Sequence, residues 1–479
     1  MAVVSRLIDL VRNRLGGICP AVIAFLVATF FQHVPLFAGD GVTPPRFTAK
    51  QIQSFIAEVV PHIERIMGRK FKELPPLVLD DEDTFARIVA ADLEPTLRRA
   101  HPELSEQELA KAALARAKEQ AVDLLGKYGL KLKKLGLMPA SLGPMLEQYQ
   151  IEPQHATGIM RLLIAHELTH ALQAQYVDVL GFLANRPTED ASAAYTSVVE
   201  GQAMFVQQGV ARALGLEKAA AEYARIFSLG DLEADDPHSR DVAVYQHFMY
   251  IEGQRFIEYH HRQGGTARLW ELLVRPPLIS SMISHPETYS PGLPKRPDLT
   301  GAFVEAVAEF RKNRWVVHEQ ELGEIHLRAM YASLEKEGLN RLADNVIAAR
   351  SLSLRSLARG EDFHLVLFAL RDRKVASELI DLLALPVAEE LKAWRQESGH
   401  RVKETRDAKL GGLVCDASRD LALVLADGHG REVFSKRVVL ASRGAVLVEA
   451  TAVNHSIPSH KLARILDGVL RAAEKAPVK

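Results

Sequence analysis

Residues 162–172 form a mostly apolar stretch that carries the sequence His166-Glu167-Leu-Thr-His170 at its centre. The flanking leucine, isoleucine and alanine residues favour a buried helix. Residues four apart on a helix lie one above the other on the same face, so both imidazoles can bind one cation. Glu167 then lies beside the remaining coordination position, where a carboxylate can take a proton from water. The segment predicts a buried metal-binding helix of a hydrolytic kind.

A third protein ligand is needed to hold such an ion tightly. Glu200 is the leading candidate, because it lies in a run of small residues at 190–203 that predicts a second helix able to approach the first closely. A lone carboxylate in such a run is costly to bury unless it is paired or binds a cation. A buried ion pair is the alternative. Weaker ligand candidates, in more polar segments, are His155, Glu189, Asp190 and His238.

The segment His166 to Gln173, followed by Val198-Val-Glu-Gly-Gln-Ala203, resembles the gluzincin-type zinc metallopeptidases. It is similar above all to a group of bacterial proteins with an extended His-Glu-Leu-Thr-His-Ala-Leu-Gln motif. With weaker matches at 275–289 and 322–324, the resemblance covers about residues 50–335. It implies Zn²⁺ as cofactor, with His166, His170 and Glu200 as metal ligands and Glu167 as catalytic general base. Ala174 departs from the group, which has Asp there.

Hydrolysis of a carbonyl compound also needs a hydrogen-bond donor that stabilises the negative charge developing on the carbonyl oxygen. We expect this catalytic residue to be His285 or Tyr289, since both lie in the proline-rich loop 276–297, part of which resembles the bacterial group. Purely local contacts within the loop are the alternative. Other candidates for the donor are Tyr245, His247, His260 and His261.

Zincin peptidases place an edge strand just before the metal-binding helix, where an extended peptide can pair with it. Residues 147–157 alternate poorly and contain Pro153, so they predict no strand. This departure leaves metal binding better supported than peptide cleavage.

The first 38 residues have the layout of an export signal, with three arginines before an apolar run at 18–31 and a more polar end. A retained membrane anchor and an ordinary buried helix are the alternatives. We expect an extracytoplasmic protein that is periplasmic, secreted or attached to the membrane through this segment. With only Cys19 and Cys415, neither a disulfide framework nor a cysteine metal cluster is expected. The net charge of -1 gives no basis for a nucleic-acid partner.

The sequence predicts an α+β chain in three parts. Residues 1–38 are the export signal or anchor, 39–335 a mainly helical zincin-like metallopeptidase domain, and 336–479 a smaller α+β domain with an antiparallel sheet and no assigned role. Helices are expected at 43–68, 105–125, 157–230, 242–262, 327–349, 375–385 and 460–475. Strands are expected at 77–79, 363–370, 421–425, 432–440 and 445–451, with a tight turn at 427–430.

The leading functional hypothesis is an exported zinc-dependent hydrolase, with a metallopeptidase acting on a peptide or protein as the favoured class. The rival is a zincin-like scaffold that binds a protein or envelope partner and cuts nothing. In a third alternative the chain binds no metal, and both histidines are packed structurally within a helical protein.

Overall fold

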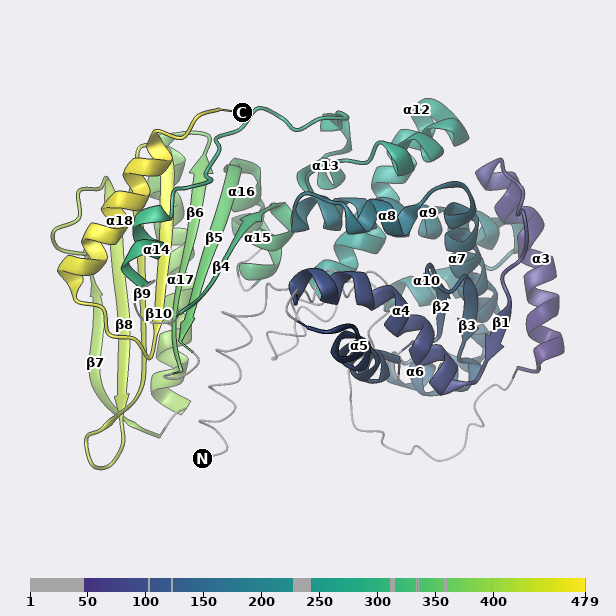
Figure 1. The fold of residues 1–479 in the computed structure, drawn as a ribbon, viewed down its shortest axis with the longest axis horizontal. Coiled ribbons are helices and arrows are strands. Elements are labelled where there is room, and N and C mark those ends of the chain that lie inside the picture. The colour runs from purple at the N-terminus through teal and green to yellow at the C-terminus, as the bar shows by residue number, and fades with distance from the viewer. Residues whose placement is uncertain are drawn as a thin grey trace. The chain divides into compact units, whose positions relative to one another are not determined.

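The computed structural model in Figure 1 describes residues 47–101, 104–121, 124–226, 243–310, 315–332, 334, 336–356, 360–397 and 399–478. The expected export signal at 1–38 therefore lies outside the described residues. No helix in the described ranges combines the length and the apolar character that crossing a membrane requires. The chain divides at Leu293 into two compact units. The sequence-based boundary at 335 lies further along the chain, beyond the first strand of the second unit.

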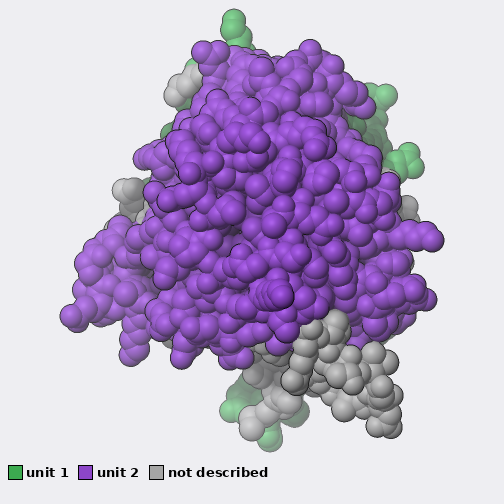
Figure 2. All heavy atoms as spheres, turned by 90° about the vertical axis from the view of Figure 1, so that its right-hand side faces the viewer, with its two compact units in different colours: residues 1–18, 293–479 green, residues 19–292 purple. Residues whose placement is uncertain are grey.

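The first unit along the chain, purple and labelled unit 2 in Figure 2, is mainly helical. Its α-helices are α3 (Ala49–Met67), α4 (Glu82–Ala100), α5 (Glu106–Ala121), α6 (Leu142–Gln148), α7 (Ala156–Tyr176), α8 (Val179–Ala184), α9 (Glu189–Leu214), α10 (Glu217–Arg225), α12 (Gly253–Val274) and α13 (Ser281–Ser284). A π-helix, η5 (His247–Glu252), leads directly into α12. Short 3₁₀ turns occupy Pro139–Ser141, Pro153–His155 and Pro286–Thr288. The strands are β1 (Leu77–Leu79), β2 (Gly126–Gly129) and β3 (Lys134–Leu137).

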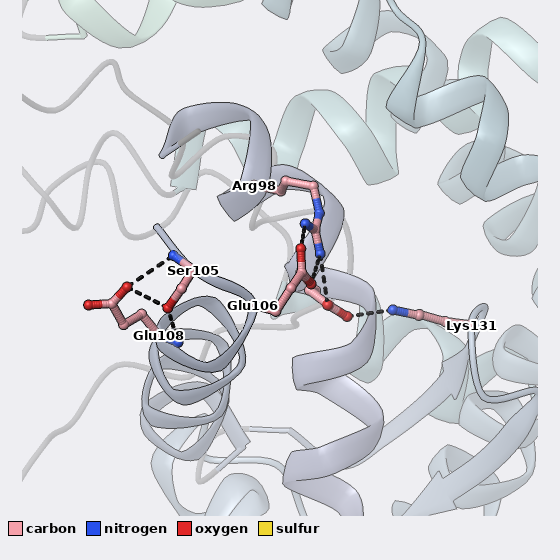
Figure 3. Close-up of polar contacts among 6 residues, drawn as sticks. Arg98, Ser105, Glu106, Glu108 and Lys131 are labelled. Atoms are coloured by element: carbon pink, nitrogen blue, oxygen red, sulfur yellow. Dashed lines mark hydrogen bonds and ion pairs between the residues drawn. The ribbon is translucent and has the colours of Figure 1, made fainter. Parts of the chain in front are cut away.

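Several local predictions for this unit are confirmed. Helix α3 and strand β1 lie where the sequence places them. Helix α5 begins with the expected capping box, in which the Ser105 backbone N–H donates to the Glu108 carboxylate at 3.0 Å and the Glu108 N–H donates to the Ser105 hydroxyl at 3.4 Å (Figure 3). Beside it, Arg98 joins α4 to α5 through an ion pair with Glu106.

The basic segment 127–134 is not wholly exposed to solvent, because the side chain of Lys127 is buried. The segment forms strand β2 and the hairpin into β3. The Lys127 side chain is buried between this hairpin and α4, where its ammonium lies 3.4 Å from the Asp92 carboxylate. The buried carboxylate supplies the countercharge that a buried lysine needs.

Strand β2 is the edge strand of a three-stranded sheet with the order β1-β3-β2. It pairs antiparallel with β3, and β3 pairs parallel with β1. The sheet packs on α7 through Gly126, since a Cβ atom at Gly126 would lie 3.2 Å from the Leu163 side chain of α7. Residues 147–157 form no strand, as the sequence predicts, but the edge strand β2, from a hairpin earlier in the chain, packs beside α7.

Helix α7 is at the centre of the helical unit, in contact with α3, α9, α10 and β2. Almost every residue from Ala156 to Gln173 is buried. A helix that is apolar on all sides is stable only where neighbouring elements cover it completely. Because α7 is covered in this way, His166 and His170 are surrounded by protein. The helix expected at 242–262 extends further, because α12 kinks at the non-helical Gly265 and continues to Val274.

The second unit contains a sheet of seven strands among the described residues, in the order β4-β5-β6-β10-β9-β8-β7 with every pair antiparallel. The strands are β4 (Val316–Leu322), β5 (Val346–Ser356), β6 (Glu361–Leu370), β7 (Arg401–Ala408), β8 (Ala417–Ala426), β9 (Glu432–Arg443) and β10 (Val446–Val453). The helices are α14 (Val304–Phe310), α15 (Glu324–Met330), α16 (Lys336–Asn345), α17 (Arg373–Glu397) and α18 (Ser459–Glu474).

Helices cover both faces of this sheet, as Figure 1 shows for α18 and α17. Phe363, Leu365 and Leu367 of β6 join the core under α14 and α18, whereas Val366 and Phe368 join the core under α15, α16 and α17. The two-residue period of a strand explains this division. The expected antiparallel α+β character is confirmed. The single helix predicted at 327–349 is wrong, because the structure has two helices there, α15 and α16, and the second ends at Asn345 before β5.

Candidate metal centre

Three side chains predicted from the sequence converge in the helical unit. His166 and His170 come from successive turns of α7, and Glu200 comes from the middle of α9. The Nε2 atoms of the two histidines lie 3.1 Å apart. Glu200 Oε2 lies 3.1 Å from His166 Nε2 and 3.3 Å from His170 Nε2. Among the described residues, these three form the cluster whose ligand atoms are close enough to share a metal ion.

The spacing of these atoms fits a tetrahedral ion. Bonds of 2.0–2.1 Å at tetrahedral angles separate neighbouring ligand atoms by about 3.3–3.4 Å. The observed separations of 3.1, 3.1 and 3.3 Å are close to that value on all three sides. Two imidazole nitrogens and one carboxylate oxygen are the donor set of an open hydrolytic zinc site. The residues therefore fit the ion that the sequence implies.

All of these groups are buried, with exposed fractions of 7% for His166, 8% for His170 and 5% for Glu200. Burial alone would raise the pKa of the Glu200 carboxyl, but the two imidazoles hold it well below its ordinary value. Burial would likewise lower the pKa of His170, and the charge of Glu200 raises it instead. The cluster thus stabilises a buried negative charge facing two ring nitrogens, which suits a cation.

Glu167 lies beside this cluster with its orientation fixed by backbone. Its Oε2 atom accepts a hydrogen bond of 2.6 Å from the backbone N–H of Tyr128 in strand β2. Tyr128 lies opposite Leu135 of β3. Its backbone N–H points away from β3, toward the free edge of β2, and donates there to the Glu167 carboxylate. One carboxylate oxygen of Glu167 is therefore held by the backbone of β2 beside the cluster.

Two buried glutamine amides form a chain of hydrogen bonds that begins at His170 Nδ1, on the side of the ring away from the cluster. Its Nδ1 atom lies 2.9 Å from Gln173 Oε1. The Gln173 amide nitrogen donates to the Val199 carbonyl at 3.1 Å and to Gln202 Oε1 at 3.1 Å. The Gln202 amide nitrogen donates to the Leu269 carbonyl at 2.7 Å. Both glutamine side chains have no exposed surface.

The sequence reasoning did not single out Tyr250, which borders the same cluster. Its ring centre lies 5.9 Å from that of His166, and its hydroxyl hydrogen-bonds Glu200. Burial, followed by the charges of Glu200 and Glu167, raises the pKa of Tyr250 well above its ordinary value, so the phenol stays protonated and donates. Burial, followed by the charges of Glu167 and Glu200, also raises the pKa of Tyr223 in α10.

A close approach of two helices brings Tyr250 to the cluster. Gly201, next to Glu200, packs against Gly253, and a Cβ atom at Gly201 would lie 2.3 Å from the Gly253 carbonyl carbon. A Cβ atom at Gly253 would lie 2.4 Å from the Ser197 carbonyl oxygen. Tyr250 lies on the π-helix just before Gly253, and π-helical turns are frequent at functional sites. A matched pair of helical glycines is the sequence signal that could have indicated this contact.

The two residues expected to donate a hydrogen bond to the oxyanion lie after α13, on either side of the 3₁₀ turn Pro286–Thr288. His285 is partly exposed, with its Nδ1 4.0 Å from the Glu287 carboxylate. The Tyr289 hydroxyl donates to the Arg275 carbonyl, and its ring packs against Phe256 and His260. Their role as oxyanion donors stays a prediction.

The weaker candidates fall elsewhere in the helical unit. Asp190 begins α9 and accepts from the Ser280 N–H at 3.1 Å, and His155 ends a 3₁₀ turn before α7. His238 lies outside the described residues. The other candidates belong to α9, η5 or their neighbours and are not members of the metal cluster found among the described residues: Glu189, Tyr245, His247, His260 and His261.

No family model matches the chain, and searches of curated proteins and of solved structures found no similar protein. The assignment of a metal centre therefore rests on the geometry of His166, His170 and Glu200.

Proposed function

We propose that the chain is a zinc-dependent hydrolase of gluzincin type, with a peptidase as the leading class. The observation that carries the proposal is the near-tetrahedral spacing of three ligand atoms, at 3.1, 3.1 and 3.3 Å, beside a carboxylate. A zinc ion bound there would lower the pKa of a water molecule to about 7 and polarise a carbonyl group.

Glu167 is the general base in this proposal. Anchored at Oε2 by the Tyr128 N–H, it takes the proton of the attacking water and hands it to the leaving amine. Tyr250 is a second donor candidate beside His285 and Tyr289, because its protonated hydroxyl already borders Glu200. A neutral phenol of this kind can donate to the oxygen on which negative charge develops.

Strand β2 supports a peptide as substrate. It is the edge strand of its sheet, and the Tyr128 N–H at its free edge is aimed at Glu167. An extended peptide that pairs with such an edge would lie near the general base, although the Tyr128 N–H itself is already occupied by Glu167.

One observation favours the rival, a scaffold that binds a partner without cutting. Every residue of β2 is buried, as is Glu167 with an exposed fraction of 6%. A substrate reaches this edge only if part of the helical unit moves, whereas zinc alone needs no such movement. Retained zinc without turnover would support the rival.

The test uses the purified full chain, its zinc content and a diverse peptide library. We expect one zinc per chain and cleavage that Glu167→Gln abolishes while zinc is retained, since the glutamine oxygen can still accept from the Tyr128 N–H. His166→Ala should lose the zinc as well. Full activity of Glu167→Gln would contradict the proposal.

A further inference from the structure

We propose that Gln173 and Gln202 form a hydrogen-bond relay that fixes the proton of His170 on Nδ1 and so presents Nε2 as the metal ligand. This inference rests on the proposed zinc site and identifies two positioning residues for it. The relay runs through α7, α9 and α12, and it ends on backbone carbonyls that cannot change direction.

A neutral imidazole has one nitrogen that carries a proton and one that carries a lone pair. A metal ligand through Nε2 therefore requires the proton on Nδ1, and an acceptor at Nδ1 selects that form. His170 Nε2 is the atom that faces His166 and Glu200, at 3.1 and 3.3 Å. The acceptor behind it is Gln173 Oε1, at 2.9 Å from Nδ1.

The direction of the Gln173 amide follows from its other partners. Its nitrogen lies 3.1 Å from the Val199 carbonyl oxygen, which can only accept. If the amide were reversed, two acceptors would face each other there, and the amide N–H₂ would face Nδ1. The Val199 carbonyl therefore determines that Oε1 points to His170.

Gln202 strengthens the same direction. Its nitrogen donates to the Leu269 carbonyl at 2.7 Å, so its Oε1 faces Gln173 and accepts at 3.1 Å. Each amide nitrogen in the relay thus donates to a backbone carbonyl, and each amide oxygen accepts from the preceding member. Buried polar groups that are paired in this way favour one arrangement.

The relay also ties the two ligand-bearing helices together. Val199 immediately precedes Glu200 on α9, and Gln173 lies one turn after His170 on α7. The hydrogen bond between Gln173 and the Val199 carbonyl therefore sets the position of the carboxylate ligand relative to the second imidazole. The same side chain orients one ligand and positions another.

The test measures zinc affinity by chelator competition and the His170 Nδ1 proton by NMR of ¹⁵N-histidine-labelled, zinc-loaded protein. Gln173→Leu should bind zinc about 10- to 100-fold more weakly, and its Nδ1 proton should exchange faster with solvent. Gln202→Leu should lose only a few-fold, because the Val199 carbonyl still orients Gln173. Gln173→Glu keeps an acceptor for Nδ1 and should restore the slow exchange. Its zinc affinity should stay below that of the wild type, because a carboxylate oxygen then faces the Val199 carbonyl and Gln202 Oε1 without a donor between them.

Gln207→Leu is the matched control, because Gln207 is a buried glutamine on the same helix α9 and outside the relay. It should leave zinc affinity and the Nδ1 proton unchanged. Wild-type affinity and slow proton exchange in folded Gln173→Leu would overturn the relay while leaving the zinc site standing. A wild-type chain that takes up no zinc would instead overturn the proposed function itself.

Discussion

The contact between Gly201 and Gly253 makes a strong prediction about the metal centre. A Cβ atom added at Gly201 would lie 2.3 Å from the Gly253 carbonyl carbon, 2.4 Å from its oxygen and 2.8 Å from the Gln254 nitrogen. Carbon atoms in contact are normally about 3.5–4.0 Å apart. Since all three atoms belong to backbone, no side chain can rotate away, and Gly201→Ala must separate the helices by about 1 Å.

The expected cost follows from two opposing effects. Overpacking of a buried contact costs about 1–3 kcal/mol, and this site belongs at the upper end because backbone meets backbone. Replacing a helical glycine by alanine stabilises the helix by about 1 kcal/mol and offsets part of this cost. We therefore expect Gly201→Ala to lower the free energy of unfolding by roughly 2 kcal/mol.

The same displacement should weaken the metal centre. Gly201 is next to Glu200, and metal–ligand distances tolerate only about 0.2 Å of error. Zinc affinity should therefore fall at least about 10-fold, which corresponds to 1.4 kcal/mol. Urea unfolding followed by circular dichroism measures the first effect, and chelator competition measures the second.

Gly209→Ala is the matched control on the same helix. A Cβ atom there meets only Ile66 Cδ1, at 2.6 Å, which is the far end of a flexible side chain. This variant should be close to wild type in stability, or up to about 1 kcal/mol more stable, with unchanged zinc affinity. If Gly201→Ala behaved like Gly209→Ala in both measurements, the close approach of α9 to η5 and α12 would be refuted.

Three further predictions concern catalysis and pH. Glu167→Gln should reduce turnover by about 10²–10⁴-fold with zinc retained; elemental analysis beside a peptidase assay checks this. Tyr250→Phe should also retain zinc but lose about 10²–10³-fold in kcat if its hydroxyl meets the oxyanion, and an unchanged kcat would return that role to His285 or Tyr289. Burial lowers the pKa of His326 and of His364 to about 4. Between about pH 6.5 and 4 these rings therefore bind protons in the unfolded chain but not in the folded chain. The free energy of unfolding should therefore fall by roughly 3 kcal/mol per ring as pH drops from about 6.5 to 4, and His364→Gln should remove one ring's share in urea titrations.

The metal cluster could be predicted because its signals are local. Two histidines four residues apart need only a helix to share a face. Glu200 followed from the cost of burying a carboxylate in a run of small residues. The structure brings all three together, as the sequence implied.

The parts that sequence reasoning missed depend on tertiary contacts. Strand β2 is Gly-Lys-Tyr-Gly, and its two glycines disfavour a strand unless a partner such as β3 stabilises it. Tyr250 lies in a π-helix, which has no periodic signal of the ordinary kind. Its proximity to Glu200 comes from a glycine contact between separate helices.

In the second unit, the error concerned where a helix ends. Residues 351–355 alternate between polar and apolar, with Leu352 and Leu354 packing on one face of the sheet, and this period indicates β5. Strand β7 was missed for another reason. It is a charged edge strand with mostly exposed side chains, so it lacks the apolar alternation of a buried strand.

Zinc X-ray absorption on the purified chain tests the central claim most directly. The geometry predicts one zinc per chain with two imidazole nitrogens and a carboxylate oxygen at about 2.0–2.1 Å. Glu200→Gln should weaken binding and change the first coordination shell. Absence of stoichiometric zinc, or a spectrum that His166→Ala and Glu200→Gln both leave unchanged, would contradict the account.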